Sequence, residues 1–327
     1  MRHDPGVPRS SVPPPDLPFD DEVIHALVRR RDTGRRDGHR IALVIGGGGM
    51  RGAYAGGMTH AIHDLELGRH FDVIYGSSAG AYIGAGLLIG KGPGTAQIFY
   101  EDMASPAFID HRRLRSRQPM IDLDHLLDAI MVDSKPMDWP ALRDSKVPLR
   151  VVATAVDDLS GHVLQPRTAA EWKLALRATS TIPWLAGRPV RLHGRRWIDG
   201  SVAEPLPLER ALRDGATHVL ALVNRTVVEL RRATPQRRAS GWARTLDRFI
   251  PGLGSMAQET RRHGPVMALL DAPKDTAPHT AHLAVVTPQQ DAGVSGLTTD
   301  PARVEEAARI GYATFRAAAD RVIAASA

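Results

Sequence analysis

The sequence predicts a three-layer α/β/α domain built on a mainly parallel sheet. Short apolar runs alternate with helical patterns from Arg40 onward, and the first two runs are each followed directly by a glycine-rich turn. The run Ile41–Ile45 is apolar at every position, as expected of a strand buried on both faces of a parallel sheet. Strands that alternate with helices are typical of a sheet covered by helices on both sides.

The expected elements follow in chain order. The strands are Ile41–Ile45, Phe71–Tyr75, Leu149–Val156, His162–Gln165, Arg195–Asp199, Thr217–Val223 and His282–Val286. The helices are Ala53–Leu67, Ala79–Ile89, Ala169–Ala178, Leu206–Asp214, Gly254–Leu270 and a last one from Pro301. Asp300 as the N-cap and Pro301 at the first helical position signal the start of that last helix. The region from Gly90 to Val147 is expected to be helical and rich in loops.

Two segments stand outside this alternation. Residues 1–39 form a Pro/Arg-rich extension, in which Asp20–Arg31 has acids at its start, apolar residues at helical spacing and arginines at its end. This pattern indicates a short amphipathic helix. Residues 40–327 form the main domain, and its Arg-rich stretch 225–248 is a candidate for a mobile surface insert.

Composition excludes several classes of protein. The chain has 327 residues, of which 43% are hydrophobic and 24% charged, and such values exclude wholesale disorder. The absence of cysteine excludes disulfides, thiolate metal sites and a cysteine nucleophile. We find neither an apolar run long enough to span a bilayer nor a secretory signal, so we expect a cytoplasmic protein.

The basic residues are mostly arginine. Among 42 Lys+Arg only five are lysine, and the net charge is +6. Arginines gather in the runs Arg29–Arg36, His111–Arg117, Gly194–Trp197 and Glu229–Arg244. Aromatic residues make up only 5%, and no run carries the interleaved aromatics of a nucleic-acid site, so we expect no nucleic-acid partner. We favour a solvated Arg-rich surface, with peripheral contact to anionic membranes as the second interpretation.

The first glycine-rich turn, GGGGMRG, spans Gly46–Gly52. Gly47, Gly49 and Gly52 satisfy G-x-G-x-x-G, which also occurs in dinucleotide sites. A dinucleotide site needs an acid at the end of the second strand, whereas Asp72 lies at its beginning. Consecutive glycine N–H groups at a helix N-terminus suit any anion, including the oxyanion of an acyl-transfer intermediate.

The second turn reads Gly76-Ser77-Ser78-Ala79-Gly80. G-x-S-x-G between a strand and a helix is the nucleophile elbow, in which a sharp turn exposes the central serine. The motif often occurs by chance, but its place after an apolar strand and before an apolar helix favours the catalytic interpretation.

A third motif supplies an acid. Asp199-Gly200 follows a predicted strand, and on its own it would be read as an ordinary turn. Together with the two glycine-rich turns, it provides a base for a serine nucleophile.

In this combination and order, the three motifs resemble those of the patatin-like phospholipases. The chain is most similar to the bacterial type of this family, which has a single patatin domain. The third motif departs from the family pattern, because Ser201 replaces the usual Gly or Ala; serine is small, so we expect the tight turn to survive. The segment Arg177–Pro183 also resembles the stretch that precedes the Asp motif in that family. The resemblance covers roughly Arg40 to Val223.

The resemblance implies a lipid acyl hydrolase of phospholipase A or carboxylesterase type that uses a Ser–Asp dyad. Ser78 would attack the ester, Asp199 would accept its proton, and the N–H groups of Gly48, Gly49 and Met50 would bind the oxyanion. The loop that would form this oxyanion hole consists of Gly47, Gly48, Gly49, Met50, Arg51 and Gly52. Arg51 would organise this loop or contact an anionic head group. No metal or organic cofactor is implied, and the partner would be a lipid or acyl ester.

Three alternatives remain open. A Ser–Asp–His triad could use His218, His263, His279 or His282, although none of these lies in a motif. An acyltransferase would use the same acyl-enzyme, and a phosphate- or nucleotide-binding protein would bind without turnover.

Trp184 and Leu185 line either an acyl pocket or simply the core.

Overall fold

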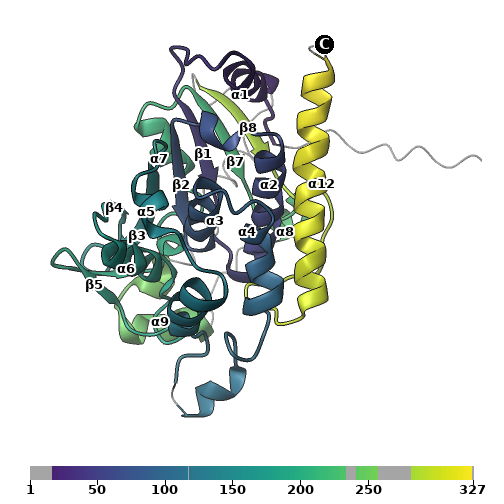
Figure 1. Ribbon diagram of the computed structural model, residues 1–327. Helices are drawn as coiled ribbons and strands as arrows, with labels where there is room; N and C mark the ends of the chain where they lie inside the picture. The colour runs from purple at the N-terminus through teal and green to yellow at the C-terminus, as the bar shows by residue number, and fades with distance from the viewer. Residues whose placement is uncertain (1–16, 117, 233–240, 257–280, 326–327) are drawn as a thin grey trace, which may run out of the picture.

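A computed structural model describes residues 17–116, 118–232, 241–256 and 281–325 (Figure 1). The strands are β1 (Ile41–Ile45), β2 (Val73–Ser77), β3 (Leu149–Ala155), β4 (Gly161–Leu164), β5 (Val190–Leu192), β6 (Arg195–Ile198), β7 (His218–Leu222) and β8 (His282–Val286). The α-helices are α1 (Asp21–Thr33), α2 (Gly52–Asp64), α3 (Ala79–Leu88), α4 (Gly94–Gln97), α5 (Trp139–Arg143), α6 (Ala169–Ser180), α7 (Leu208–Arg213), α8 (Val227–Arg232), α9 (Gly241–Phe249) and α12 (Pro301–Ala325). Short 3₁₀ turns and two π-helical segments, Ile98–Met103 and His125–Ser134, complete the described chain.

The strands form one sheet in the order β5-β6-β3-β2-β1-β7-β8, with β4 paired to β3. The central pairs β3–β2, β2–β1, β1–β7 and β7–β8 are parallel, whereas β4, β5 and β6 pair antiparallel at one end. The carboxyl ends of the parallel strands therefore share one edge, where ligands bind in open α/β sheets.

The side chains of β1 show why the sheet carries helices on both faces. Ile41, Leu43 and Ile45 join the core under α2, α3 and α12, whereas Ala42 and Val44 join a second core under α7 and α8. Figure 1 shows α12 running alongside α2. Alternate strand residues point to opposite faces, so a strand that is apolar throughout buries both. The predicted three-layer α/β/α fold is confirmed.

Helix α1 packs into the domain instead of projecting from it. The Asp20 side chain caps its N-terminus by accepting from the N–H of Glu22, and Gly34 ends it with φ +65°. Val23, Ile24 and Leu27 are fully buried in the main core, and the helix contacts β8 and α12. The apolar face expected from the sequence is therefore not available at the surface.

Several boundaries differ from the expected ones. Strand β2 begins and ends two residues later than predicted, because Ile74 to Ser77 pair with β3. Strand β5 was not predicted from the sequence; it has three residues, and its partner among the described strands is β6. Most of the predicted helix Gly254–Leu270 lies outside the described residues. Among the described residues, no helix combines the length and apolar composition needed to cross a bilayer.

Candidate active site

Ser78 occupies a strained turn between β2 and α3. Its backbone has φ +52° and ψ −126°, a conformation rare for residues other than glycine, and its side chain is buried. The Ser78 N–H donates to Thr179 Oγ1 at 2.8 Å, and the Thr179 hydroxyl donates to the carbonyl of Val152. At Gly80, an added Cβ would lie 2.2 Å from the carbonyl oxygen of Ile45, so only glycine permits this helix start.

Asp199 lies directly after β6 and meets Ser78. The Ser78 hydroxyl donates to Asp199 Oδ2 at 2.8 Å, and both side chains are buried. The N–H of Ser201 donates to the other carboxylate oxygen at 2.7 Å, and the Thr154 hydroxyl donates to the Asp199 carbonyl at 2.8 Å. One carboxylate oxygen is thus held by the turn, which directs the other toward Ser78.

The glycine loop after β1 lies beside Ser78. The N–H of Gly47 donates to Pro205, and that of Met50 donates to the carbonyl of Gly296 at 3.1 Å. Within the described chain, the N–H groups of Gly48 and Gly49 have no hydrogen-bond acceptor, and both residues line the same cavity as Ser78. Two free N–H groups can bind an oxygen that becomes negatively charged. The N–H of Met50, expected to share this role, is already engaged.

Asn224 holds the glycine loop, and the sequence analysis missed it. Its Nδ2 donates to the carbonyl of Gly46 at 2.7 Å, and its Oδ1 accepts from the N–H of Ala55 at 3.0 Å. The side chain is buried between the loop and α2. A sequence signal existed, because Asn224 follows the apolar strand β7 at the same edge of the sheet as the glycine loop.

The other motif residues build the turns around this pair. Gly76 and Ser77 end β2, Ala79 and Gly80 begin α3, Gly52 begins α2, and Gly200 and Ser201 lie in a 3₁₀ turn after Asp199. The hydroxyls of Ser77 and Ser201 are buried without a hydrogen-bond partner among the described residues. The Ser201 turn is intact, as expected for a small side chain.

The three motifs lie within a region that matches a known protein family. The family model described as patatin-like phospholipase matches residues 43–212, a span that contains all three motifs. The chain belongs to the patatin-like phospholipase family. It is also 31% identical over 214 residues to YjjU, an uncharacterized protein of Escherichia coli (strain K12). That match covers 64% of this chain and 57% of YjjU, so the chain spans little more than half the length of this relative.

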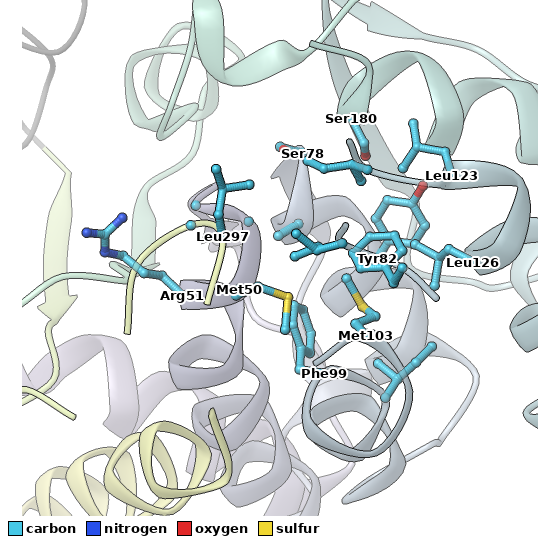
Figure 2. Close-up of a pocket in the computed structure, with 18 of the residues that line it drawn as sticks. Met50, Arg51, Ser78, Tyr82, Phe99, Met103, Leu123, Leu126, Ser180 and Leu297 are labelled. Atoms are coloured by element: carbon cyan, nitrogen blue, oxygen red, sulfur yellow. The ribbon is translucent and has the colours of Figure 1, made fainter. Parts of the chain in front are cut away.

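A large apolar cavity adjoins Ser78 in this patatin-like chain. Its volume is about 910 Å³, and Ser78, Asp199, Gly48 and Gly49 form part of its wall. Figure 2 shows apolar side chains gathered beside Ser78, among them Tyr82, Phe99, Met103, Leu123 and Leu126. Trp184 and Leu185 also line the cavity, and Trp184 remains 45% exposed. A cavity of this size and character can hold an extended apolar chain.

Arg51 lines the cavity beside the glycine loop, and its guanidinium group lies near α8. Its Nε lies 3.6 Å from Glu229 Oε1 of α8, and Figure 2 shows its guanidinium turned away from Ser78. Glu229 in turn accepts from the N–H of Thr226 at 3.0 Å. Arg51 therefore reaches α8 while its side chain also borders the cavity.

Two of the histidines considered for a triad lie at the wrong edge of the sheet. His218 and His282 are the first residues of β7 and β8, whereas Ser78 follows the carboxyl end of β2. Burial lowers the pKa of His218 to about 4. His263 and His279 lie outside the described residues.

Proposed function

We propose that this protein is a lipid acyl hydrolase of phospholipase A or carboxylesterase type that works through a Ser78–Asp199 dyad. The observation that carries the proposal is the 2.8 Å hydrogen bond from Ser78 Oγ to Asp199 Oδ2. Beside it lie an apolar cavity and two glycine N–H groups that have no acceptor among the described residues. Membership of the patatin-like phospholipase family supports hydrolysis of lipid esters in general.

In the first half-reaction, Ser78 Oγ attacks the ester carbonyl carbon while its proton passes to Asp199 Oδ2. The carbonyl oxygen becomes an oxyanion, which the N–H groups of Gly48 and Gly49 stabilise. When this intermediate collapses, the bond to the leaving alcohol breaks and Asp199 returns the proton to that alcohol. The acyl group is then bound to Ser78 as an ester.

In the second half-reaction, water attacks the acyl-enzyme. Asp199 Oδ2 takes a proton from the water as the new carbon–oxygen bond forms, and collapse of the second intermediate releases the fatty acid. The proton returns to Ser78 Oγ, so the dyad is restored and the net reaction consumes one water. The apolar cavity excludes bulk water and strengthens the hydrogen bonds to the oxyanion.

The cavity supports an acyl chain as the group that is bound. Its wall beside Ser78 is built largely from Leu, Ile, Met and Phe side chains, whose burial against a hydrocarbon chain contributes about 25 cal/mol per Å². Lys91, His111 and Lys135 also line the cavity. Lys135 is paired with the carboxylates of Glu101 and Asp102, which leaves Lys91 as the described lysine of this wall that suits an anionic head group.

Ser78→Ala and Asp199→Asn test the dyad. We expect each variant to lose hydrolysis of a p-nitrophenyl ester, and Ser78→Ala also to lose labelling by a fluorophosphonate probe, with unchanged circular dichroism. Ser105→Ala and Asp158→Asn are matched controls, because Ser105 donates to the Asp102 carbonyl and Asp158 bonds to its exposed neighbours Ser160 and Arg195. An Asp199→Asn enzyme that retains most of its rate would contradict the proposal.

A further inference from the structure

A second group of chemically active side chains lies at the opposite edge of the sheet. Glu22 is in the first turn of α1, His39 is in the loop before β1, and His218 is the first residue of β7. One carboxylate oxygen of Glu22 and one ring nitrogen from each histidine lie within 4.8 Å of one another. Nothing in the proposed ester chemistry uses these residues.

The unsatisfied imidazole of His218 points to a missing partner. The side chain is 1% exposed, and its Nε2 has no hydrogen-bond partner among the described residues. Its Nδ1 lies 2.9 Å from Thr217 Oγ1, which leaves Nε2 as the free nitrogen. A buried polar atom without a partner is costly, so this nitrogen calls for a water, a ligand or an ion.

The surroundings hold the two rings in place. The ring of His218 lies between those of His39 and His282, with centroid distances of 4.3 Å and 4.6 Å. His282 is itself fixed by Asp20, at 2.8 Å from its Nδ1. The His39 backbone is fixed by Arg30, which donates to the His39 carbonyl at 2.8 Å. Positioning of this kind lowers the entropic cost of binding an ion.

We propose that Glu22, His39 and His218 bind a divalent transition-metal ion, with Zn²⁺ as the ion that fits best. Two imidazoles and one carboxylate are a common zinc donor set, and solvent can supply the fourth ligand because Glu22 and His39 are partly exposed. Mg²⁺ and Ca²⁺ prefer oxygen donors and fit this set poorly. The ion would join α1, the loop before β1 and β7, and so would stabilise the fold.

The ion pair between Arg29 and Glu22 provides a test of whether Glu22 is a metal ligand. Arg29 donates to both carboxylate oxygens of Glu22, at 2.5 Å and 3.5 Å, and therefore competes with a metal for this ligand. The imidazole of His25 lies 3.8 Å from Glu22, and the carboxylate of Asp37 lies 3.9 Å from His39 Nε2. Removing the Arg29 guanidinium should strengthen metal binding, which would not happen if the metal bound elsewhere.

The test is calorimetric titration of the untagged, EDTA-treated full-length protein with ZnCl₂, with Co²⁺ absorption as a probe of nitrogen coordination. We expect one tightly bound Zn²⁺ per chain, a raised Tm in its presence, and no effect of Mg²⁺ on Tm. Glu22→Gln and His39→Ala should each weaken zinc binding by at least about tenfold, and Arg29→Ala should strengthen it. These three positions are partly exposed, so the variants should fold even where a change at buried His218 would not.

His60→Ala is the matched control. His60 forms a similar pair with Asp64 at 3.5 Å on α2 but belongs to no group of three described ligands. Wild-type protein that binds no zinc, unaltered binding by Glu22→Gln and His39→Ala, or an equal loss in His60→Ala would each overturn the proposal. Ester hydrolysis should not respond to zinc at this edge of the sheet, so a failure here and a failure of the dyad are distinguishable.

Discussion

At the residue scale, a threonine helps to hold the geometry of Ser78. Its strained backbone, with φ +52°, is held by the hydrogen bond from its N–H to Thr179 Oγ1. The same hydroxyl donates to Val152 in the neighbouring strand, so Thr179 connects the turn to the sheet. Strain at a reactive residue persists only where surrounding contacts hold it.

Thr179→Val should therefore reduce catalysis while keeping the shape of the side chain. The change leaves two buried groups, the Ser78 N–H and the Val152 carbonyl, without this partner, and we expect a loss of about 2 kcal/mol in the free energy of unfolding. The kcat for a soluble ester should fall about tenfold or more, because a displaced nucleophile is no longer aligned. Thr59→Val is the control, since this hydroxyl is also buried and donates to the Gly56 carbonyl within α2. An unchanged kcat in Thr179→Val would show that Thr179 does not position Ser78.

Gly49→Ala tests the glycine loop. Gly49 has φ +58°, and an added Cβ would lie 2.4 Å from the carbonyl oxygen of Gly296, so the loop must move. Displacing an oxyanion donor should lower kcat by about 10²–10³ with little change in KM. Gly38→Ala is the control, because its surroundings are open. A change confined to KM would instead indicate that the loop binds a ground-state anion such as phosphate.

At the element scale, a buried arginine links α1 to the start of β1, in addition to the apolar packing of the helix. Arg30 is 2% exposed and donates to Asp37, Asp72 and the carbonyls of His70 and His39. The Asp72 carboxylate also accepts from the N–H of Ile41 at 2.7 Å, so Arg30 neutralises a charge at the start of β1.

Arg30→Met should lower the free energy of unfolding by about 3 kcal/mol, because Asp37 loses its arginine, Asp72 keeps only the exposed Arg36 as a described ion-pair partner, and the carbonyls of His39 and His70 lose a donor. Urea denaturation measures the change. Arg309→Gln on α12 is the control: its pair with Glu306 is exposed, and such pairs contribute about 0.5 kcal/mol. Similar losses in the two variants would show that Arg30 has no special role in anchoring α1.

The contact between β2 and the end of α7 produces a pH dependence. Burial, together with the hydrogen bond to Asp214 at 2.6 Å, raises the pKa of Tyr75 to about 12. The folded state then keeps a proton that the unfolded state loses above pH ~10, so this contribution to stability is complete below pH ~10 and disappears as the pH rises toward ~12. Urea denaturation at two pH values should show a smaller alkaline loss in Tyr75→Phe than in the wild type. Equal losses would contradict this assignment.

At the scale of the whole molecule, the cavity and the exposed apolar residues indicate how a lipid could be reached. Trp184 lines the cavity and is 45% exposed, while α9 contributes Leu246 to the cavity wall and leaves Phe249 54% exposed. Because the apolar face of α1 is buried, these exposed residues, rather than this helix, are the described candidates for a membrane contact.

We expect the Ser78→Ala protein to sediment with anionic vesicles at low salt and less at high salt, because screening weakens the attraction of basic residues to the surface. Adding Trp184→Ala should reduce this association, since Trp favours the membrane interface. Leu174→Ala, at another partly exposed apolar residue, is the control. Equal sedimentation with neutral and anionic vesicles at every salt concentration would rule out electrostatic docking.

The sequence by itself determined the fold class and the positions of the three motifs. Apolar runs such as Ile41–Ile45 and turns such as Gly76–Gly80 are local patterns, in which burial and backbone conformation are encoded by neighbouring residues. These patterns were sufficient to predict the three-layer α/β/α fold and to single out Ser78 and Asp199. They did not predict β5, whose three residues are a strand only because β6 lies beside them.

Tertiary structure alone decided which groups surround these residues. The N–H of Met50 is engaged because Gly296 approaches it from the segment before α12, and Asn224 and Thr179 reach the site from β7 and α6. The burial of α1 and the meeting of Glu22, His39 and His218 likewise join segments far apart in the chain. Hydrogen-bond partners and burial depend on which distant segments the sheet order brings together, and local periodicity does not specify that order.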